Sequence, residues 1–135
     1  MRNILLVTLL AVLLVAAGCV QTGGADIPLM ETASKVFADV IVPIGFTISY
    51  SDSFHTGTPS GRAGVLRYSG SADMERIVTF YKERMPRNGW ELKNTVRSGT
   101  EEALFFKSGS EGCAVIIKDS STFLWKTVDL TIIVF

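Results

Sequence analysis

The chain has few of the residues on which enzyme active sites and metal centres are usually built. Its 135 residues include one histidine, His55, and two cysteines, Cys19 and Cys113. A Ser-His-Asp hydrolase needs a histidine beside its nucleophile, and a zinc site needs three or four His, Cys or carboxylate ligands. One catalytic arrangement remains, in which His55 would have to meet Asp52 and Ser53 in the fold. We therefore expect a protein that is not an enzyme and holds no metal or other cofactor.

An excess of charge of either sign is also missing. Thirteen Lys and Arg residues balance thirteen Asp and Glu residues, and charged residues make up 19% of the chain. Proteins that bind nucleic acid neutralise its phosphates with a surplus of basic side chains. The twelve glycines nowhere form a phosphate-binding loop between a strand and a helix. The composition argues against nucleic acid as a partner and gives nucleotide binding no support.

One long apolar run stands at the N-terminus. Met1-Arg2-Asn3 is a short positive segment, and residues 4–17 are apolar except for Thr8. This layout is typical of a secretory signal, and the run is shorter than the roughly 20 apolar residues that a membrane-spanning helix needs. We expect cleavage between Gly18 and Cys19; removing 18 of the 135 residues leaves a mature chain of 117.

The residues around the cut, Leu14-Val15-Ala16-Ala17-Gly18-Cys19, resemble the lipobox of bacterial lipoproteins. Ala16 departs from the family pattern, which most often has leucine at that position. The resemblance implies a diacylglycerol on the Cys19 sulfur and acylation of the new amine, and two or three acyl chains hold a protein at a bilayer. Val20, in place of aspartate, indicates the periplasmic face of the outer membrane in a Gram-negative host. The alternative is an ordinary secretion signal in which Cys19 is incidental.

Cys113 has no expected disulfide partner. Exported proteins often carry disulfides, but a thioether-linked lipid on Cys19 would leave Cys113 alone in the apolar stretch at residues 113–117. Free cysteine is among the most buried residue types, so we expect a small buried side chain. A reactive or intermolecular thiol is the alternative.

The mature chain reads as a tether followed by one domain. Residues 19–28 are rich in Gly, Thr, Gln and Asp and predict a flexible tether, and residues 29–135 predict a single domain. Apolar residues between 29 and 41 have helical spacing but weak helix propensity, so a short helix and an extended lead-in are both open. Residues 46–50 and 64–69 alternate like strands, and the Ser-, Thr-, Gly- and Pro-rich residues 51–62 between them predict an exposed loop.

The clearest predicted element is a helix over residues 72–85. Met74, Ile77, Val78, Tyr81 and Met85 form one apolar stripe, and Ser71 is the expected N-cap. Four strand candidates follow, separated by short turns: Trp90–Arg97, Glu102–Lys107, Gly112–Lys118 and Leu124–Phe135. The order ββαββββ predicts an α+β fold in which one helix packs on an antiparallel sheet. The alternating side chains Val128, Leu130, Ile132 and Val134 are expected to face the helix.

A second resemblance covers most of the mature chain. Tyr81-Lys82-Glu83-Arg84-Met85-Pro86, followed by Asn88-Gly89-Trp90, is similar to small uncharacterised lipoproteins of Gram-negative bacteria. These motifs imply a shared fold, and that family offers no activity to transfer.

Two sets of side chains are candidate binding surfaces. The basic set consists of Arg62, Arg67, Arg76, Lys82, Arg84 and Arg87. It could bind anionic lipid headgroups or an acidic partner, and the alternative is an ordinary solvated surface. The aromatic set consists of Phe54, Phe80, Phe105, Phe106, Phe123 and Trp125. It could form a protein-binding patch, line a lipid-binding groove, or cover the second sheet face beneath the N-terminal segment.

The sequence predicts a non-enzymatic, lipid-anchored interaction or structural module of the cell envelope. Its expected partners are the membrane, through lipid on Cys19, and an envelope protein or an anionic lipid. The alternative is a periplasmic carrier of a small ligand or lipid, in which the helix and sheet enclose a cavity.

Overall fold

The structure, a computed structural model, describes residues 28–58 and 61–135. The predicted signal, the cleavage site between Gly18 and Cys19, and nearly all of the predicted tether lie outside the described residues. In the part of the chain that the structure covers, no helix has the length and apolar character needed to cross a bilayer.

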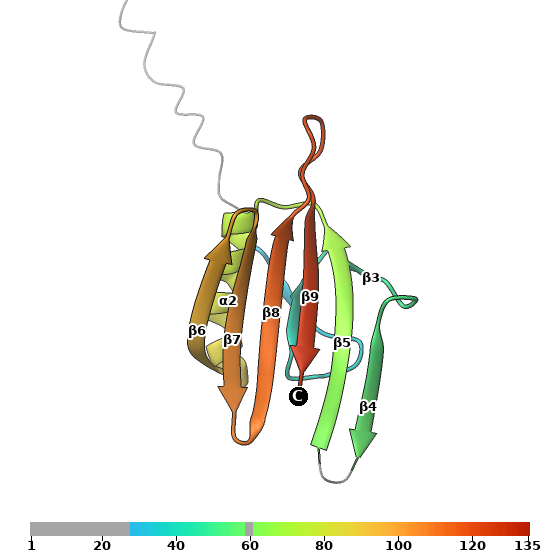
Figure 1. The fold of residues 1–135 in the computed structure, drawn as a ribbon, viewed down its shortest axis with the longest axis vertical. Helices are drawn as coiled ribbons and strands as arrows, with labels where there is room; N and C mark the ends of the chain where they lie inside the picture. Colours follow the sequence, from blue (N-terminus) through green and yellow to red (C-terminus); the bar gives the residue numbers. More distant parts are fainter. Residues whose placement is uncertain (1–27, 59–60) are drawn as a thin grey trace, which may run out of the picture.

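Most of the described chain forms an antiparallel sheet with one α-helix against it, which confirms the predicted α+β class (Figure 1). The sheet order is β3-β5-β9-β8-β7-β6, β4 also pairs with β5, and β1 and β2 pair separately. The strands are β1 Glu31–Ala33, β2 Ile41–Pro43, β3 Thr47–Ile48, β4 Phe54–Thr58, β5 Gly61–Gly70, β6 Glu91–Ser98, β7 Glu101–Ser108, β8 Glu111–Asp119 and β9 Val128–Val134. The helix is α2 Met74–Arg84, which a 3₁₀ helix, η1 Met85–Asn88, continues.

The helix forms where the apolar stripe predicted it. Met74, Ile77, Val78 and Tyr81 are all buried against the sheet. It packs against β7 and β8 of the sheet and against β2 of the hairpin. The stripe therefore specifies both the helix and the face that it buries.

The start of the helix differs from the prediction. The N-cap is Asp73, not Ser71, and its side chain makes no capping hydrogen bond. The Ser71 hydroxyl instead donates to the Lys126 carbonyl oxygen at 3.0 Å. The predicted Ser71 cap is wrong because this hydroxyl fastens the β5–α2 connection to the loop before β9.

The four strands after the helix form the predicted meander, with one boundary changed. Gly99 and Gly109 lie in the two short turns with φ of 57° and 58°. The connection from β8 to β9 is longer, covering residues 120–127, and β9 begins at Val128 where Leu124 was expected. Hydrogen bonds such as that from the Ser120 N–H to the Thr127 carbonyl oxygen, 2.9 Å, close this loop above the strands.

Two expectations about the first half of the chain are corrected. Residues 29–41 contain no helix; β1 and β2 form a hairpin, and the Ser34 hydroxyl accepts the N–H groups of Val36 and Phe37 in its turn. Residues 51–62 are not one long loop, because β4 pairs with β5 along its whole length. A polar strand is stable there because the ladder to β5 satisfies its backbone and its side chains need no core.

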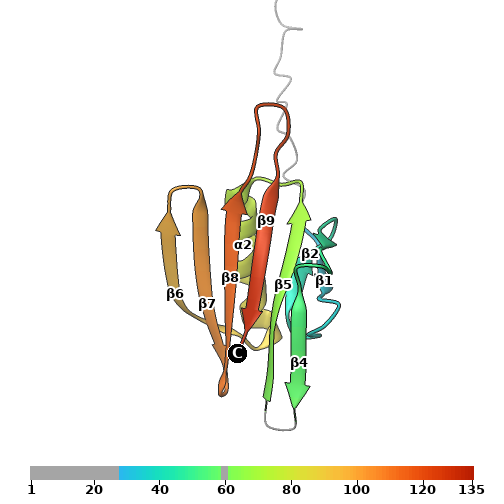
Figure 2. The ribbon, with the colours of Figure 1, turned by 45° about the vertical axis from the view of Figure 1, so that its right-hand side comes forward.

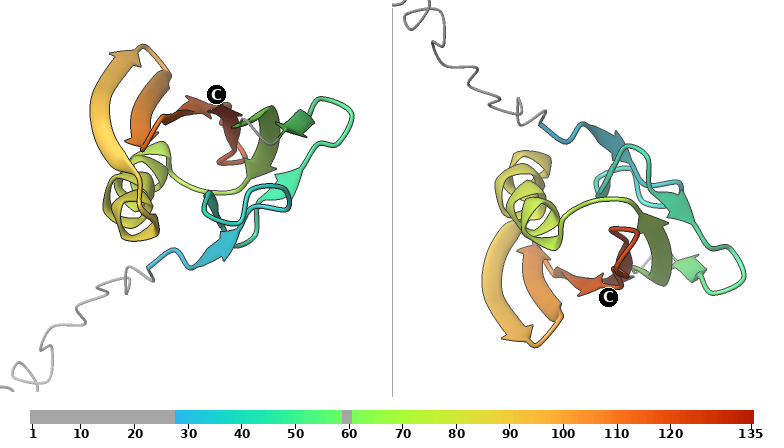
Figure 3. Two further views of the ribbon diagram at one scale, coloured as in Figure 1. Left: turned by 90° about the horizontal axis from the view of Figure 1, so that it is seen from below. Right: turned by 90° about the horizontal axis from the view of Figure 1, so that it is seen from above.

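The molecule has two layers. Seen along the strands, the sheet curves over α2 on one side and over the β1–β2 hairpin on the other, both on the same face (Figure 3). Phe37, Val40 and Val42 from the hairpin share one core with Ile77 and Tyr81 from the helix. The four alternating residues of β9 are buried in that core, as predicted. No helix or strand among the described residues packs on the other face of the sheet, which we call the open face.

Candidate functional site

The open face of the sheet carries a continuous line of apolar side chains across five strands. Strand pairing places Phe54 beside Val65, Val65 beside Ile133, Ile133 beside Ala114, and Ala114 beside Phe105. Alternate residues of a strand point to opposite faces, and in β5, β9, β8 and β7 the residues next to these, such as Leu66, Ile132 and Leu104, are buried in the core on the other face. We call this line the apolar row. Its two ends are open to solvent, since Phe54 is 66% and Phe105 37% exposed, whereas Val65 and Ile133 are partly buried and the small Ala114 between them is 4% exposed.

The open face becomes polar towards the end of the sheet where β5 ends and α2 begins. The next line of paired residues is mixed: Arg67, Thr131, Ile116, Ala103 and Val96. The line after that is polar and charged: Ser69, Asp129, Lys118 and Glu101. Along the strand direction, the side chains on this face therefore change from apolar to charged.

A groove of about 860 Å³ lies on this gradient. Its floor is Val65, Ile116 and Ile133, and one wall is formed by Thr47, Ile48, Ser49 and Asp52. At its polar end stand Arg67, Lys118, Glu101 and Asp129. We call it the sheet groove. It combines an apolar floor with two cations and two carboxylates at one end, which suits a ligand that has an apolar chain and a polar head.

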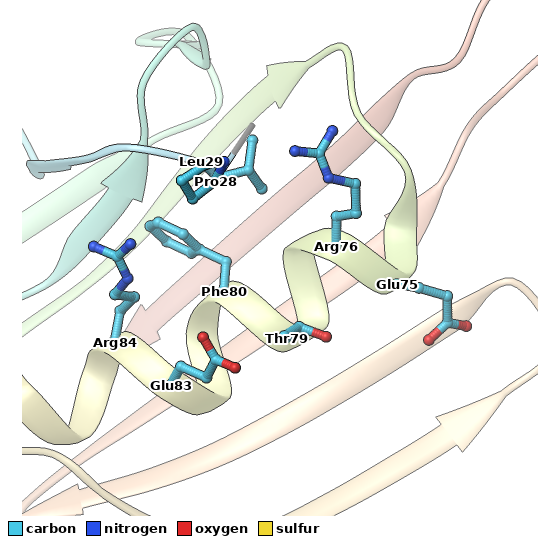
Figure 4. Close-up of a pocket in the computed structure, with 8 residues that line it drawn as sticks. All are labelled: Pro28, Leu29, Glu75, Arg76, Thr79, Phe80, Glu83 and Arg84. Carbon is cyan, nitrogen blue, oxygen red and sulfur yellow. The ribbon is translucent and has the colours of Figure 1, made fainter. Parts of the chain in front are cut away.

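A second, smaller depression of about 360 Å³ lies on the outer side of α2 (Figure 4). Pro28 and Leu29 lie over Phe80, and the rim consists of two basic and two acidic side chains: Arg76, Arg84, Glu75 and Glu83. Arg84 also pairs with Glu31 at 3.1 Å. The balanced charge gives this depression no preference for an anion.

The structure does not gather the five arginines of the predicted anionic-ligand patch on one surface. Arg62 and Arg67 are five residues apart on β5, so they lie on opposite faces of the sheet. Arg62 is bound between Asp39 and Glu111, at 2.5 and 2.8 Å. Arg76 and Arg84 meet at the helix depression, and Arg87 is exposed in η1. Only Arg67 lines the sheet groove.

The aromatic set divides into core, open face and loop. Phe80 and Phe106 are buried, whereas Phe54 and Phe105 lie on the open face. Phe123 and Trp125 are exposed in the β8–β9 loop. The expectation that the N-terminal segment covers the second face is wrong, because that segment packs beside α2 on the first. The adjacent phenylalanines of β7 were the sequence signal for the open face, since one of two neighbours in a strand must face away from the core.

The space between α2 and the sheet is filled by side chains. Tyr81, Met85, Trp90 and Leu104 are each at most 1% exposed there. The buried Tyr68 and Tyr81 hydroxyls have no hydrogen-bond partner among the described residues. Both depressions described above lie outside this space.

Cys113 is part of this interior, as predicted. It is 1% exposed, and burial raises the pKa of its thiol to about 12. A thiol with so high a pKa is a poor nucleophile at neutral pH. Cys113 is therefore a packing residue.

The residues that a hydrolase would need are engaged in other contacts. The Ser53 hydroxyl donates to the Ser49 carbonyl oxygen at 2.5 Å, and Asp52 accepts the Ser49 hydroxyl at 2.6 Å. The ring of His55 packs edge-on to Phe37, with 6.5 Å between centroids. These contacts shape the β3–β4 turn and do not align a nucleophile with a base.

Comparison with known proteins gives one result. The sequence profile of a family described as START domain-like matches residues 50–122. The match begins just after β3 and runs through β4, β5, α2 and the β6–β8 meander into the β8–β9 loop. No curated protein and no solved structure matches the chain.

Proposed function

The chain belongs to the START domain-like family, because the match spans more than half of its 135 residues, and on this premise we propose that it is a non-catalytic binding module. Domains of this type are generally binding modules and not enzymes. We propose further that its ligand is amphipathic, with one acyl chain and a polar head, and that the sheet groove holds it. This is the carrier alternative raised by the sequence, with the site moved from the interior to the open face.

The observation that carries this proposal is the uncovered apolar floor of the groove. Val65, Ile116 and Ile133 are only partly buried, although they lie in the middle of a sheet. Covering apolar surface stabilises a complex by roughly 25 cal/mol per Å². An acyl chain lying on this floor would remove it from water, and no described element of the chain does so.

The charges at the polar end support an amphipathic ligand over a purely apolar one. Arg67 and Lys118 are exposed there and can donate hydrogen bonds to a phosphate or carboxylate. Asp129 and Glu101 stand beside them and can accept from an amine or hydroxyl. A headgroup with both kinds of group fits this arrangement.

We propose that the module is held at a membrane by lipid on Cys19, facing the periplasm from the outer membrane if the host is Gram-negative. The support is the sequence pattern that ends at Gly18-Cys19. Mass spectrometry of the mature N-terminus checks it: an acylated Cys19 is expected, and an unmodified or uncleaved one would contradict the anchor.

Binding of a dansyl-labelled fatty acid, followed by its fluorescence, tests the groove. We expect saturable binding to the purified chain and a loss of about tenfold in affinity for Ile116→Gln, because a polar group on the floor costs of order 1.4 kcal/mol. The matched control is Val96→Gln, an apolar residue on the same face outside the groove lining, which should bind as the wild type does.

The groove proposal fails if the probe does not bind, or if Ile116→Gln and the wild type bind it equally while circular dichroism shows both folded. If an added phospholipid displaces the labelled fatty acid from the chain, the result extends to a natural class of ligand.

A protein partner on the same face is the second candidate. It is favoured by Phe54 and Phe105, which extend the apolar row beyond the groove on both sides. A photo-crosslinking residue at position 105 would capture such a partner in membranes, whereas the same residue at Thr95, exposed on the opposite face of β6, would not.

A further inference from the structure

The loop between β8 and β9 presents three consecutive large apolar side chains to solvent. Phe123 is fully exposed, and Leu124 and Trp125 are 74% and 73% exposed. The loop projects beyond the ends of the neighbouring strands (Figures 1 and 2). We propose that this apolar tip inserts into the surface of the bilayer that carries the protein's own anchor. This inference rests on the proposed lipid at Cys19.

Hydrogen bonds within the loop close the backbone of the tip. The Thr122 N–H donates to the Trp125 carbonyl oxygen at 2.8 Å, and the Trp125 N–H donates to the Thr122 hydroxyl at 3.2 Å. The Ser120 N–H donates to the Thr127 carbonyl oxygen at 2.9 Å. Because unsatisfied backbone groups are costly away from water, a turn that satisfies its own can enter the interface more cheaply.

The base of the loop is fastened to the start of α2. Lys126 forms an ion pair with Asp73, and its carbonyl oxygen accepts the Ser71 hydroxyl. The Ser120 hydroxyl donates to Asp129 at 2.5 Å. These contacts fix the direction in which the tip points relative to the helix and the sheet.

The chain enters the domain from the same end. Pro28 and Leu29 lie beside Arg76 and Phe80, and Glu31 then pairs with Arg84, so the chain runs along α2 from its beginning towards its end (Figure 4). Phe80 is six residues into the helix, about 9 Å from its start. The nine residues from Cys19 to Pro28 can span at most about 30 Å. An anchor at Cys19 can therefore reach the plane in which the tip would insert.

A bilayer fits the tip better than a protein surface does. Three side chains of this size offer at most about 500 Å², whereas each partner in a stable protein complex buries about 800 Å². Tryptophan is enriched at membrane–water interfaces, where its amphipathic ring sits at the level of the headgroups. The polar residues Ser120, Ser121 and Thr122 directly precede the tip, so hydroxyl groups adjoin its apolar side chains. The anchor supplies the high local concentration that a weak second contact needs.

The two tryptophans make the test specific. Trp90 is 1% exposed in the core, so a change at the membrane reports Trp125. The lipid-modified chain is reconstituted into vesicles of phosphatidylethanolamine and phosphatidylglycerol, with or without bromine in the acyl chains, and floated on a density gradient. We expect brominated lipid to quench the tryptophan emission of the wild type and not that of Trp125→Phe.

Replacing both neighbours, Phe123→Ser with Leu124→Ser, should remove most of this quenching. The matched control Phe135→Ser, which removes an exposed aromatic just after β9, at the end of that strand opposite to the loop, should leave it unchanged. Wild-type protein that floats with vesicles but is quenched no more by brominated than by plain lipid would overturn the proposal, as would equal quenching of the double variant. Protein that does not float would instead contradict the anchor at Cys19.

Discussion

Arg62 joins three segments that are far apart in the sequence. Its guanidinium donates to both carboxylate oxygens of Asp39 at 2.5 and 2.6 Å and to Glu111 at 2.8 to 3.1 Å. It also lies 5.4 Å from the centre of the Phe37 ring. The β1–β2 turn, the start of β5 and the start of β8 therefore meet at one side chain. The sequence predicted Arg62 as part of a binding patch, and the structure shows a structural tie.

We expect Arg62→Ala to lower the free energy of unfolding by about 2 kcal/mol. This lies between the 0–1 kcal/mol of an exposed ion pair and the 3–5 kcal/mol of a buried one, since the Arg62 side chain is 28% exposed. Urea denaturation measures it, with exposed Arg87→Ala as the control. A loss no larger than that of the control would contradict the assignment.

The same pair predicts a pH dependence. Hydrogen bonding to Arg62 holds the pKa of Asp39 below its usual value. A carboxyl whose pKa is depressed on folding adds stability above its unfolded pKa, about 3.9, and loses it as the pH falls through the folded value. The difference between the wild type and Arg62→Ala should therefore be constant near neutral pH and shrink below about pH 4.

At the level of elements, short turns set the register of the meander. Ser108 pairs with Glu111, so Gly109 and Ser110 form a two-residue hairpin loop, and Gly109 has a φ of 58°. Such loops need residues that tolerate positive φ. The turn residues were visible in the sequence, which is why both ends of β6, β7 and β8 could each be predicted to within one residue.

Gly109→Val should cost about 1–2 kcal/mol of stability, because a β-branched residue is strained at positive φ. Gly109→Asn should cost less, and Ser110→Ala should be close to neutral. Thermal unfolding of the three variants measures the order. Equal midpoints for Gly109→Val and Ser110→Ala would show that the turn is not under this constraint.

Other elements could not be predicted from local pattern. β4 is polar and contains Gly57, and it is a strand because β5 offers it a ladder. Leu124 and Trp125 look like the first residues of an apolar strand, yet they form the tip of a loop because hydrogen bonds close the chain below them. In both cases a contact between segments overrides composition.

At the scale of the whole molecule, layering creates the open face. Core residues from α2 and from the β1–β2 hairpin cover one face of β5, β9 and β8, and nothing described covers the other. The backbone amide hydrogens of an edge strand exchange with water more easily than those of a central strand, because an edge strand is hydrogen-bonded to a neighbour on one side only.

Native-state hydrogen exchange should therefore be slowest in β9 and β8, which pair on both sides beneath the core, and faster in β6, which pairs only with β7. Mass spectrometry of exchanged peptides measures this. If a ligand binds in the sheet groove, adding it should slow amide hydrogen exchange in β5, β8 and β9 further and leave the exchange rate in β6 unchanged. Faster exchange in β9 than in β6 would contradict the sheet order.

The sequence by itself determined the helix, the meander and the burial of Cys113, because apolar periodicity and turn residues act over a few positions. It also contains the pattern from which lipid on Cys19 is proposed. The tertiary structure decided where the remaining groups lie. It places Arg62 and Arg67 on opposite faces of the sheet, Phe105 on the open face, and Trp125 in a projecting loop. Each depends on which face of the sheet the helix and the N-terminal hairpin cover, and that choice is made by packing between segments distant in the chain.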